Sequence, residues 1–418
     1  MTPFITVSLV AIVALVATAA ALRSRSFAVF VGFLLGLNLL ITAGLEPQFG
    51  AGAPVAWYLQ GAATLHFAAL LRARLRGNAY RLLISFPAHF WMAGTFLAFP
   101  WAIATAFGLP PLGWWLPFLA ALFGLSQSLR ASMELVELHL DGSDQGDDLK
   151  RSRSVQRHPI ASAPPPQANS RLLRVVQITD PHLGPFMSEA RLHGICERAV
   201  AQDPALVLLT GDFFTMEGAG TEKSLERAMA PLKDLPGRVF ACRGNHDLEV
   251  PDKVADELAA IGARLLIDEA EMVETSQGPV QLVGLDHIWR GRSERFAQVL
   301  GDISPGRSVL RIVLLHDPTG FIHLPPGTAD LVLSGHTHGG HLGLISLGLD
   351  WTTVGAIFGV PDHGFWSRGR DRMYVHRANG HYGFPLRIGV PAEESVLRLV
   401  LSGQPPPMER PSYQSVGL

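Results

Sequence analysis

The chain has 418 residues, of which 17% are charged, and its formal net charge at pH 7 is −2. This length is too great for one compact core and indicates two or more domains. The near-neutral charge gives no reason to expect nucleic acid as a partner.

Long apolar runs gather in residues 1–130 and predict an all-α transmembrane region. Each run is close to the roughly 20 residues that a helix needs to cross a bilayer core, where lipid offers the backbone no other hydrogen-bond partner. A cleaved signal peptide at Met1–Leu22 is the alternative for the first run, but it lacks a basic start, and more apolar runs follow. About five spans are expected: Pro3–Leu22, Phe27–Leu45, Ala51–Leu71, Leu82–Phe107 and Leu112–Leu129.

Basic residues lie in alternate loops of this region. Arg23 follows the first run, residues 72–81 carry several arginines after the third, and Arg130 follows the fifth, whereas the other two loops contain no Lys or Arg. Under the positive-inside rule, the residues after Arg130 then lie in the cytoplasm. If Ala51–Leu71 does not cross, four spans remain and the C-terminal part faces outside. The sequence therefore predicts a multi-pass protein, of a bacterial inner membrane, with its C-terminal part in the cytoplasm.

Residues 131–170 are expected to connect the membrane region to a folded domain. Ala131–Leu140 is predicted to continue the last span as a short amphipathic helix. The following residues, 141–170, are rich in Asp, Arg, Ser and Pro and are interpreted as a linker because they cannot bury enough apolar surface to fold alone. The domain is placed at 171–401, and a C-terminal tail at 402–418.

The domain alternates apolar runs of strand length with segments of helical period, which is typical of α/β folds. The expected strands are Leu173–Ile178, Ala205–Leu209, Arg238–Cys242, Val280–Leu285, Val309–Leu315 and Leu331–Ser334. The expected helices are Ser188–Gln202, with Ser188 as a candidate N-cap, Ser224–Leu232 and Val254–Ile261.

Five polar motifs follow the carboxyl ends of these strands. Alone, each motif also fits a strand-end turn or a buried core histidine. Together they supply two carboxylates, an amide and several imidazoles at the sheet edge where ligands collect, a mixture that suits a pair of divalent metals. The motifs are Asp180-Pro181-His182, Gly211-Asp212, Gly244-Asn245-His246-Asp247, His316 and Gly335-His336-Thr337-His338.

The order and residue types of these motifs resemble the calcineurin-like metallophosphoesterase family, in its membrane-linked branch, over roughly Arg171 to Leu401. The resemblance implies a four-layer α/β/β/α sandwich that binds two divalent ions (Mn, Fe or Zn), with Asp212 bridging them. It implies that the first ion takes Asp180, His182, Asp212 and His338, and the second takes Asp212, Asn245, His316 and His336.

Further residues are expected beside the metals. The resemblance implies that His246 is not a ligand but protonates the leaving oxygen or stabilises the transition state. Asp247 is expected to orient that imidazole, with a helix cap as the alternative. Arg243 and Arg377 are candidate substrate contacts, although the segment around Arg377 departs from the family's commoner Ser-Arg-Gly pattern. His341 and Asn379 are weaker candidates of the same kind.

Leu342–Phe358 runs largely apolar directly after the last metal motif. It is interpreted either as a packed core segment or as an apolar lid or membrane-facing rim beside the site.

These features predict a membrane-anchored dinuclear-metal phosphoesterase that hydrolyses a phosphoester or pyrophosphate bond. The lipid bilayer is an expected partner, and a lipid-linked substrate, such as a phospholipid or a UDP-diacylglucosamine-like precursor, is favoured. The alternatives are a phosphodiesterase acting on a soluble phosphodiester, and a non-enzymatic membrane sensor or transporter with a degenerate domain. The presence of Asp212 and Asn245 argues against a degenerate domain, and the scarcity of ionisable groups in the spans argues against transport.

Overall fold

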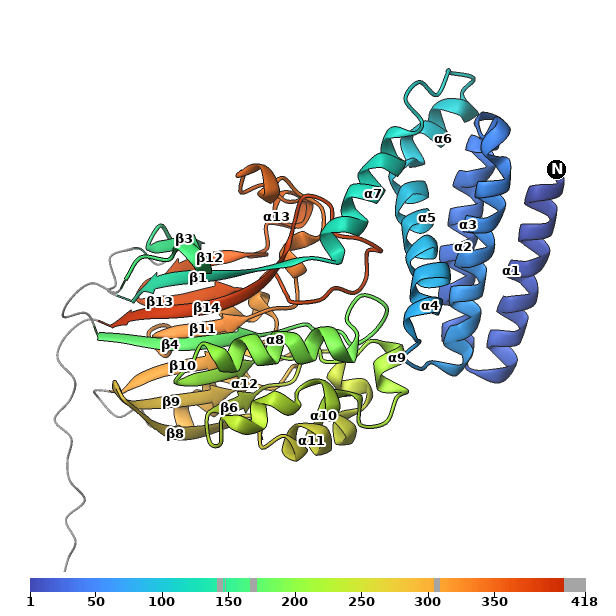
Figure 1. The fold of residues 1–418 in the computed structure, drawn as a ribbon. Helices are drawn as coiled ribbons and strands as arrows, with labels where there is room; N and C mark the ends of the chain where they lie inside the picture. Colours follow the sequence, from blue (N-terminus) through green and yellow to red (C-terminus); the bar gives the residue numbers. More distant parts are fainter. Residues whose placement is uncertain (141–145, 147, 166–170, 304–308, 402–418) are drawn as a thin grey trace, which may run out of the picture.

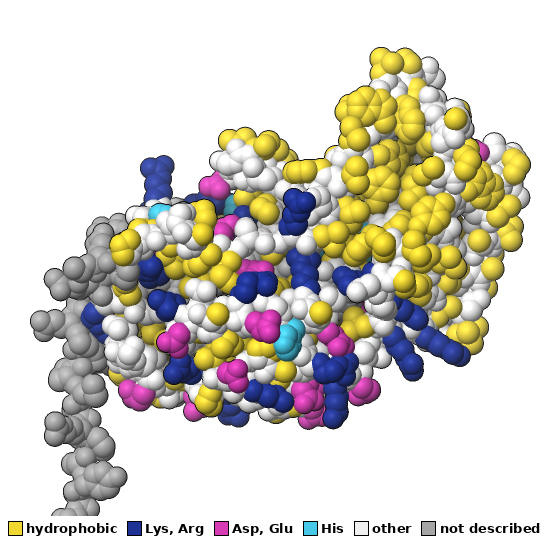
Figure 2. Space-filling model, viewed as in Figure 1, with side chains coloured by type: hydrophobic (Ala, Val, Ile, Leu, Met, Phe, Trp, Pro, Cys, Tyr) yellow, Lys and Arg dark blue, Asp and Glu magenta, His cyan; other side chains and the backbone are white. Residues whose placement is uncertain are grey.

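The structure, a computed structural model, describes residues 1–140, 146, 148–165, 171–303 and 309–401. It has two parts, a helical bundle at the N-terminal end and a two-sheet domain beside it (Figure 1). Apolar side chains cover the visible face of the bundle, whereas charged side chains are scattered over the domain (Figure 2). The predicted C-terminal tail at 402–418 lies outside the described residues.

The bundle is built from helices that stand side by side (Figure 1). Thr2 caps α1 by accepting from the N–H of Ile5, and Ser24 caps α2 by accepting from the N–H of Phe27. The longer helices are α1 (Pro3–Leu22), α2 (Arg25–Leu45), α3 (Ala53–Ala69), α5 (Phe86–Leu97), α6 (Phe99–Ala106) and α7 (Leu116–Ser128). The short connecting elements are η1 (Glu46–Gln48), η2 (Gly50–Gly52), η3 (Leu70–Arg72), α4 (Asn78–Tyr80) and the π-helical turn η4 (Arg81–Ser85).

Two of these helices, α1 and α2, are long and apolar enough to cross a membrane. The stretch from α4 to α6 would be a third span, but it bends by 50° between Leu97 and Phe99. Pro100, in the first turn of α6, has no N–H to continue the ladder, which accounts for the break. Helix α3 has 17 residues and α7 has 13, so both are shorter than the two clear spans. The count of five spans stays a prediction.

Polar side chains inside the bundle are paired with each other. Nε1 of Trp91 donates to Oε1 of Gln60 at 2.8 Å, and Nδ2 of Asn38 donates to Oγ1 of Thr95 at 2.5 Å. Such bonds between helices satisfy groups that would be costly to bury alone. The contact of Gln60 is thus an interhelical hydrogen bond.

Two seven-stranded sheets form the domain. In the first sheet β4, β5 and β6 are parallel, and in the second β9, β10, β11 and β13 are parallel, so each sheet collects strand ends at one edge. The first sheet runs β3 (Val155–Pro159), β1 (Ala131–His139), β14 (Ala392–Leu401), β4 (Arg171–Ile178), β5 (Leu206–Leu209), β6 (Val239–Ala241) and β7 (Arg264–Leu265). The second runs β2 (Lys150–Arg151), β12 (Gly364–Arg368), β13 (Asp371–Val375), β11 (Leu331–Ser334), β10 (Leu310–Leu314), β9 (Gly278–Gly284) and β8 (Glu269–Thr275).

Helices cover the outer faces of both sheets. Leu192 of α8 and Leu258 of α11 share an apolar cluster with the first sheet, Phe296 of α12 shares another with the second sheet, and a third cluster fills the space between the sheets. This confirms the four-layer α/β/β/α sandwich. The helical elements of the domain are η5 (Ile160–Ser162), α8 (Glu189–Ala201), α9 (Met216–Ala219), α10 (Ser224–Ala228), η6 (Ala230–Asp234), η7 (Asp247–Glu249), α11 (Pro251–Ala260), α12 (Arg292–Asp302), η8 (Pro318–His323), η9 (His338–Gly340), η10 (Ile345–Leu347) and α13 (Thr353–Phe358).

The amphipathic helix predicted at Ala131–Leu140 is wrong, because Ala131–His139 is the inner strand β1. Its side chains alternate between two faces, with Leu135 toward the helix layer and Val136 and Leu138 toward the space between the sheets. Alternation of this kind fits a strand that is buried on both faces. The expected linker also contributes strands, since β2 pairs with β12 and β3 pairs with β1.

The two parts share an interface on which the Arg-bearing loops lie. Nε of Arg81 donates to the carbonyl of Pro185 at 2.7 Å, and the N–H of Leu75 donates to Oγ1 of Thr221 at 2.8 Å. Nη2 of Arg23 lies 3.3 Å from Sδ of Met216. Ala93 and Ala121 of the bundle pack with Phe186 and Leu386 of the domain in one apolar cluster. The domain is therefore on the same side of the bundle as the loops after α1 and α3.

Candidate dinuclear metal centre

All five polar motifs follow strands that formed as predicted. Strands β4, β5, β6, β10 and β11 end two or three residues before Asp180, Asp212, Gly244, His316 and His336. Because these strands are parallel to their neighbours within each sheet, their carboxyl ends bring the motifs to one edge of the sandwich. Helix α8 is also confirmed, with Oγ of Ser188 accepting from the N–H of Arg191 at 3.2 Å.

The first group of potential ligands is Asp180, His182 and His338, whose ligand atoms lie within 4.8 Å of one another. Nε2 of His338 is 3.3 Å from Oδ1 of Asp180, and Nε2 of His182 is 3.9 Å from the same oxygen. Nδ1 of His182 donates to the carbonyl of Phe214 at 3.3 Å, which leaves Nε2 directed at the carboxylates. This is the tautomer that a metal-binding imidazole needs.

The second group is Asp212, His316 and His336, which satisfies the same 4.8 Å limit. Nδ1 of His316 donates to the carbonyl of Thr210 at 2.7 Å, so its Nε2 lies toward the site. That Nε2 is 3.2 Å from Oδ2 of Asp212 and 3.2 Å from Nδ1 of His336. Two imidazole nitrogens and one carboxylate oxygen therefore converge on one point.

Asp212 lies between the two groups. Its Oδ2 atom is 3.2 Å from Nε2 of His316 in one group and 3.5 Å from Nε2 of His182 in the other. Its Oδ1 atom accepts the backbone N–H of His246 at 2.8 Å, which fixes the plane of the carboxylate. A single carboxylate thus reaches both candidate ion positions.

Unpaired buried atoms test whether these residues fit a pair of ions. Within the described part of the chain, Nε2 of His182 and Oδ1 of Asn245 are buried without a hydrogen-bond partner. A buried polar atom without a partner costs free energy, and ligation to a cation would satisfy both atoms. The donors are imidazole nitrogens and amide or carboxylate oxygens, which suit borderline and hard divalent metals. The residues therefore fit the expected metals.

The loops that carry the ligands are in strained backbone conformations. Asp180, His182, Asp212, His336 and His338 have φ angles of 48°, 47°, 55°, 69° and 54°. Residues other than glycine rarely adopt positive φ, and such strain is concentrated at functional sites. Glycines allow the loops to approach closely: a Cβ atom on Gly335 would lie 2.1 Å from Oδ2 of Asp180, and one on Gly244 would lie 2.2 Å from Oδ1 of Asp212.

The buried charges shift the protonation of the imidazoles in opposite directions. Burial lowers the pKa of His182 to about 3, despite the opposing effect of Asp212, so that its ring is neutral. Burial also opposes protonation of His316, but Asp212 and Asp180 outweigh it and raise its pKa to about 10. The carboxylates therefore attract positive charge to the second group, which a divalent cation supplies more strongly than a proton.

His246 lies beside the ligands rather than among them. Its ring centroid is 5.3 Å from that of His182, and its Nδ1 is 3.4 Å from Oε1 of Glu249. Burial lowers its pKa, but the hydrogen bond with Glu249 and the charge of Asp212 outweigh this, so its pKa is raised above the usual value. A protonated imidazole at this place is suited to give a proton to a leaving oxygen.

The contacts of Asp247 are with backbone amides, and its predicted role in orienting His246 stays a prediction. Its Oδ2 atom accepts the backbone N–H groups of Asp212 and Gly244, each at 2.8 Å, and its Oδ1 accepts that of Phe213 at 2.9 Å. The carboxylate is thus occupied by backbone amides, and Glu249 is the acidic partner of His246. Asp247 holds two metal-ligand loops together.

The two predicted substrate arginines are both in ion pairs. Arg377 is buried, with Nε 2.8 Å from Glu393 and Nη2 2.9 Å from Glu134, so its guanidinium is already paired and a substrate contact stays a prediction. Glu134 belongs to β1, the strand that the sequence did not predict. Arg243 pairs with Asp286 through two hydrogen bonds of 3.0 and 2.5 Å at a partly buried position. A substrate contact by Arg243 stays a prediction.

The weaker candidates have different outcomes. Oδ1 of Asn379 accepts the N–H of Thr179 at 2.8 Å and its Nδ2 donates to the carbonyl of Glu393, which makes it a structural residue. The ring of His341 stacks on that of His338 with centroids 4.9 Å apart. The core interpretation of Leu342–Phe358 is wrong, because Leu347 is 73% exposed and Phe358 is 72% exposed.

Sequence reasoning missed two residues that touch the site. The ring of Tyr382 stacks on His182, with centroids 5.4 Å apart, and meets His246 edge-on at 4.8 Å. Arg387 is fully buried and donates to the carbonyls of His338 at 3.0 Å and Arg377 at 2.7 Å. Neither residue lies in a motif or at a predicted strand end, so the sequence carried no signal for them.

The sequence comparisons agree with this geometry. Residues 173–340 match the family model described as Calcineurin-like phosphoesterase, and the chain therefore contains a calcineurin-like metallophosphoesterase domain. Domains of this class are metal-dependent phosphoester hydrolases. The helices α1 and α2 place an apolar, membrane-associated part before that domain.

Curated relatives extend over the same half of the chain. "Phosphodiesterase YaeI" of Escherichia coli is 27% identical over 237 residues, 56% of this chain and 84% of that protein. An uncharacterized metallophosphoesterase of Helicobacter pylori is 27% identical over 56% of this chain and 61% of its own length. "Transmembrane protein with metallophosphoesterase domain" of Bos taurus is 25% identical over 58% of this chain and 55% of that protein. The match thus spans less than two thirds of the latter two relatives.

Proposed function

We propose that this chain is a membrane-anchored enzyme that hydrolyses a phosphoester or pyrophosphate bond with two divalent metal ions. The observation that carries the proposal is the position of Asp212, whose Oδ2 lies 3.5 Å from His182 and 3.2 Å from His316. Dinuclear phosphoesterases need one ligand shared between two ions roughly 3.5–4 Å apart, and Asp212 meets that need.

The remaining ligands divide between two ions. Asp180, His182 and His338 would be the other ligands of one ion. Asn245, His316 and His336 would be the other ligands of the second ion. Bound ions of this kind lower the pKa of coordinated water and offset negative charge on the phosphoryl oxygens. Mn, Fe and Zn all accept this set of nitrogen and oxygen donors.

His246 would act as the proton donor to the leaving oxygen. Its ring stands beside His182 and is paired with Glu249, and the hydrogen bond with Glu249 raises its pKa, which favours the protonated form. Glu249 would orient the imidazole and stabilise its charged form. Asp247 and Arg387 would act indirectly, by holding the backbone of Asp212 and His338 in place.

We favour a lipid-linked substrate, such as a phospholipid or a UDP-diacylglucosamine-like precursor. Support comes from the apolar bundle against the domain and from the exposed apolar side chains between Leu342 and Phe358, which suit contact with a bilayer surface. The second candidate is hydrolysis of a soluble phosphodiester, which the relative named as a phosphodiesterase favours.

We also propose that the protein is a multi-pass membrane protein with its domain in the cytoplasm. The loops that contain Arg23 and Arg81 contact the domain, so the basic residues and the domain lie on one side of the bundle. The positive-inside rule places that side in the cytoplasm.

A metal-dependent assay tests the proposed function. The purified full-length protein would be stripped of metal, reloaded with Mn, Fe, Zn or Mg, and assayed against p-nitrophenyl phosphate, bis(p-nitrophenyl) phosphate, phospholipids and a UDP-linked lipid. We expect turnover with at least one metal and one ester, and its loss in Asp212→Ala. Metal-loaded protein that hydrolyses none of these esters would contradict the proposal, and turnover of the soluble esters alone would favour the second candidate.

A further inference from the structure

A cavity of about 480 Å³ lies between the bundle and the domain. Helices α2, α3 and α5 contribute side chains such as Leu34, Phe67 and Met92, and loops of the domain contribute Phe186, Tyr382 and Phe384. The volume falls within the range of sites that bind small molecules. Neither part of the protein forms this cavity alone.

One side chain, Tyr382, lies between the cavity and the candidate metal centre. Tyr382 lines the cavity, and its ring also stacks on His182 and meets the ring of His246. A molecule that contacts Tyr382 in the cavity would therefore lie next to a side chain that packs on His182, a candidate ligand of the first ion.

The walls of the cavity are mostly aromatic and aliphatic, and several of its polar side chains contact one another or other rings. The rings of His66 and His89 meet edge-on with centroids 4.7 Å apart, and His89 meets Phe186 edge-on at 4.8 Å. Glu217 accepts a hydrogen bond from Oγ1 of Thr215 at 2.9 Å. Aromatic and aliphatic side chains make up most of the lining, which favours a hydrocarbon as the ligand.

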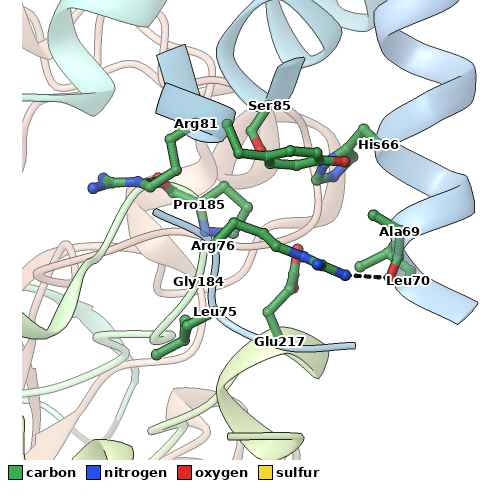
Figure 3. Close-up of a pocket in the computed structure, with 11 residues that line it drawn as sticks. His66, Ala69, Leu70, Leu75, Arg76, Arg81, Ser85, Gly184, Pro185 and Glu217 are labelled. Carbon is green, nitrogen blue, oxygen red and sulfur yellow. Dashed lines mark hydrogen bonds between the residues drawn. The ribbon is translucent and has the colours of Figure 1, made fainter. Parts of the chain in front are cut away.

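The polar boundary of the cavity is visible in Figure 3. The drawn residues line a neighbouring pocket of about 10 Å³ that shares His66, Leu70, Pro185 and Glu217 with the large cavity. Arg76 extends there toward the carbonyl of Ala69, to which its Nη2 donates at 3.1 Å (Figure 3). The charged groups thus lie at the end of the bundle where the Arg-bearing loop meets the domain.

We propose that this cavity binds one hydrocarbon chain of an amphiphilic substrate while the phosphoester lies at the metal centre. The inference rests on the proposed function and deepens it, because it makes the bundle part of the substrate site as well as an anchor. A chain that lies among α2, α3 and α5 would reach the site directly from the bilayer. Tyr382 would lie at the junction between the chain and the phosphoester, where it positions the substrate.

A chain-length series tests the inference. The full-length, Mn-loaded protein would be assayed with p-nitrophenyl alkyl phosphodiesters from ethyl to octyl, below their micelle concentrations, by release of p-nitrophenolate and the alkyl phosphate. We expect kcat/KM to rise with each methylene, by up to about fourfold, because burial of one CH₂ contributes about 0.8 kcal/mol. Equal kcat/KM along the series in an active enzyme would overturn the inference and leave the proposed function intact.

Variants that fill the cavity give a matched comparison. Leu34→Trp and the smaller change Ala88→Leu place volume in the cavity and should reduce the ratio of octyl to ethyl kcat/KM toward one. Val29→Trp is the control on α2, because Val29 is 71% exposed on the bundle surface and should keep the wild-type ratio. An unchanged ratio in a cavity variant with a wild-type unfolding midpoint would contradict the inference.

A binding measurement gives a readout that is independent of turnover. An octyl methylphosphonate with a diazirine at the chain end would be photo-crosslinked to the full-length protein, and the adducts mapped by mass spectrometry. We expect adducts on peptides that contain Met92, Phe96 or Phe384, and their loss in Leu34→Trp but not in Val29→Trp. Adducts spread over the outer bundle surface would overturn the inference. Adducts in the cavity of a protein that hydrolyses no ester would refute the proposed function alone.

Discussion

The carboxylate of Asp247 accepts the backbone N–H of Asp212 at 2.8 Å. This bond, with those from Gly244 and Phe213, fixes the loop in which Asp212 has a φ of 55°. The side chain of Asp247 thus controls the position of Asp212, the candidate shared ligand. The same bonds leave Glu249, two residues along the chain, as the acidic partner of His246.

Asp247→Ala should destabilise the protein and remove metal. The variant leaves three buried backbone N–H groups without their acceptor, and a single unsatisfied donor costs about 1–3 kcal/mol. We expect the free energy of unfolding to fall by at least that amount and both ions to be lost, as measured by denaturant unfolding and elemental analysis. Glu249→Gln is the control, because Glu249 is an exposed partner of His246: metal content and stability should stay near wild type while turnover falls. Full metal and stability in Asp247→Ala, with reduced turnover, would support the orienting role.

Asp212→Ala and His246→Ala should separate metal binding from proton transfer. We expect Asp212→Ala to lose activity together with metal, because one carboxylate reaches both ligand groups. His246→Ala should keep its metal and lose about 10²–10⁴-fold in turnover, the usual effect of removing a general acid. The loss should be smaller for p-nitrophenyl esters, whose leaving group needs little protonation, than for alkyl esters. Equal metal loss in both variants would make His246 a ligand and refute the general-acid assignment.

Gly335→Ala should disrupt the metal centre although it adds only one methyl group. The new Cβ would lie 2.1 Å from Oδ2 of Asp180 and 2.3 Å from Oγ1 of Thr179, so the loop with His336 and His338 must move. We expect loss of metal and activity in elemental analysis and ester assays. Gly301→Ala in α12 is the control, since no atom lies within 4 Å of its added Cβ. It should leave metal binding unchanged and stabilise the helix by roughly 0.5–1 kcal/mol. A fully metallated Gly335→Ala protein would show that this close approach is not required.

The convergence of the candidate metal ligands was predictable because each follows an apolar run that forms a buried strand. His316 and Asp212, for example, are distant in sequence and follow strands of different sheets, β10 and β5, but they meet at the same edge of the sandwich. The side-chain types then indicate the chemistry. Local signals also sufficed for α8, whose N-cap is Ser188. Such features depend on a few consecutive residues and on the geometry of parallel sheets.

Other features depend on contacts between distant segments and left no local signal. Because β1 follows an apolar helix, its sequence favours the prediction that the helix continues, but its hydrogen bonds with β14 make it a strand. Arg377 pairs with Glu134 on β1 and with Glu393 on β14. Asp247 accepts hydrogen bonds from backbone amides. Backbone groups are the same at every residue, so their hydrogen-bond partners cannot be read from residue types. The roles of Tyr382 and Arg387 required the same three-dimensional information.

The side of the membrane on which the domain lies can be measured with fusions to the C-terminus of the full-length chain. Because the loops with Arg23 and Arg81 contact the domain, and basic loops stay in the cytoplasm, we expect a fluorescent protein fusion to be bright and an alkaline phosphatase fusion to be inactive. Fusions at Gly108, in the loop without Lys or Arg between α6 and α7, are the matched control and should give the opposite pattern. An active phosphatase at the C-terminus would mean four spans or a cleaved first segment. That result would not contradict the proposed hydrolysis at the metal centre. It would contradict a nucleotide-linked lipid as the substrate, because such precursors are cytoplasmic.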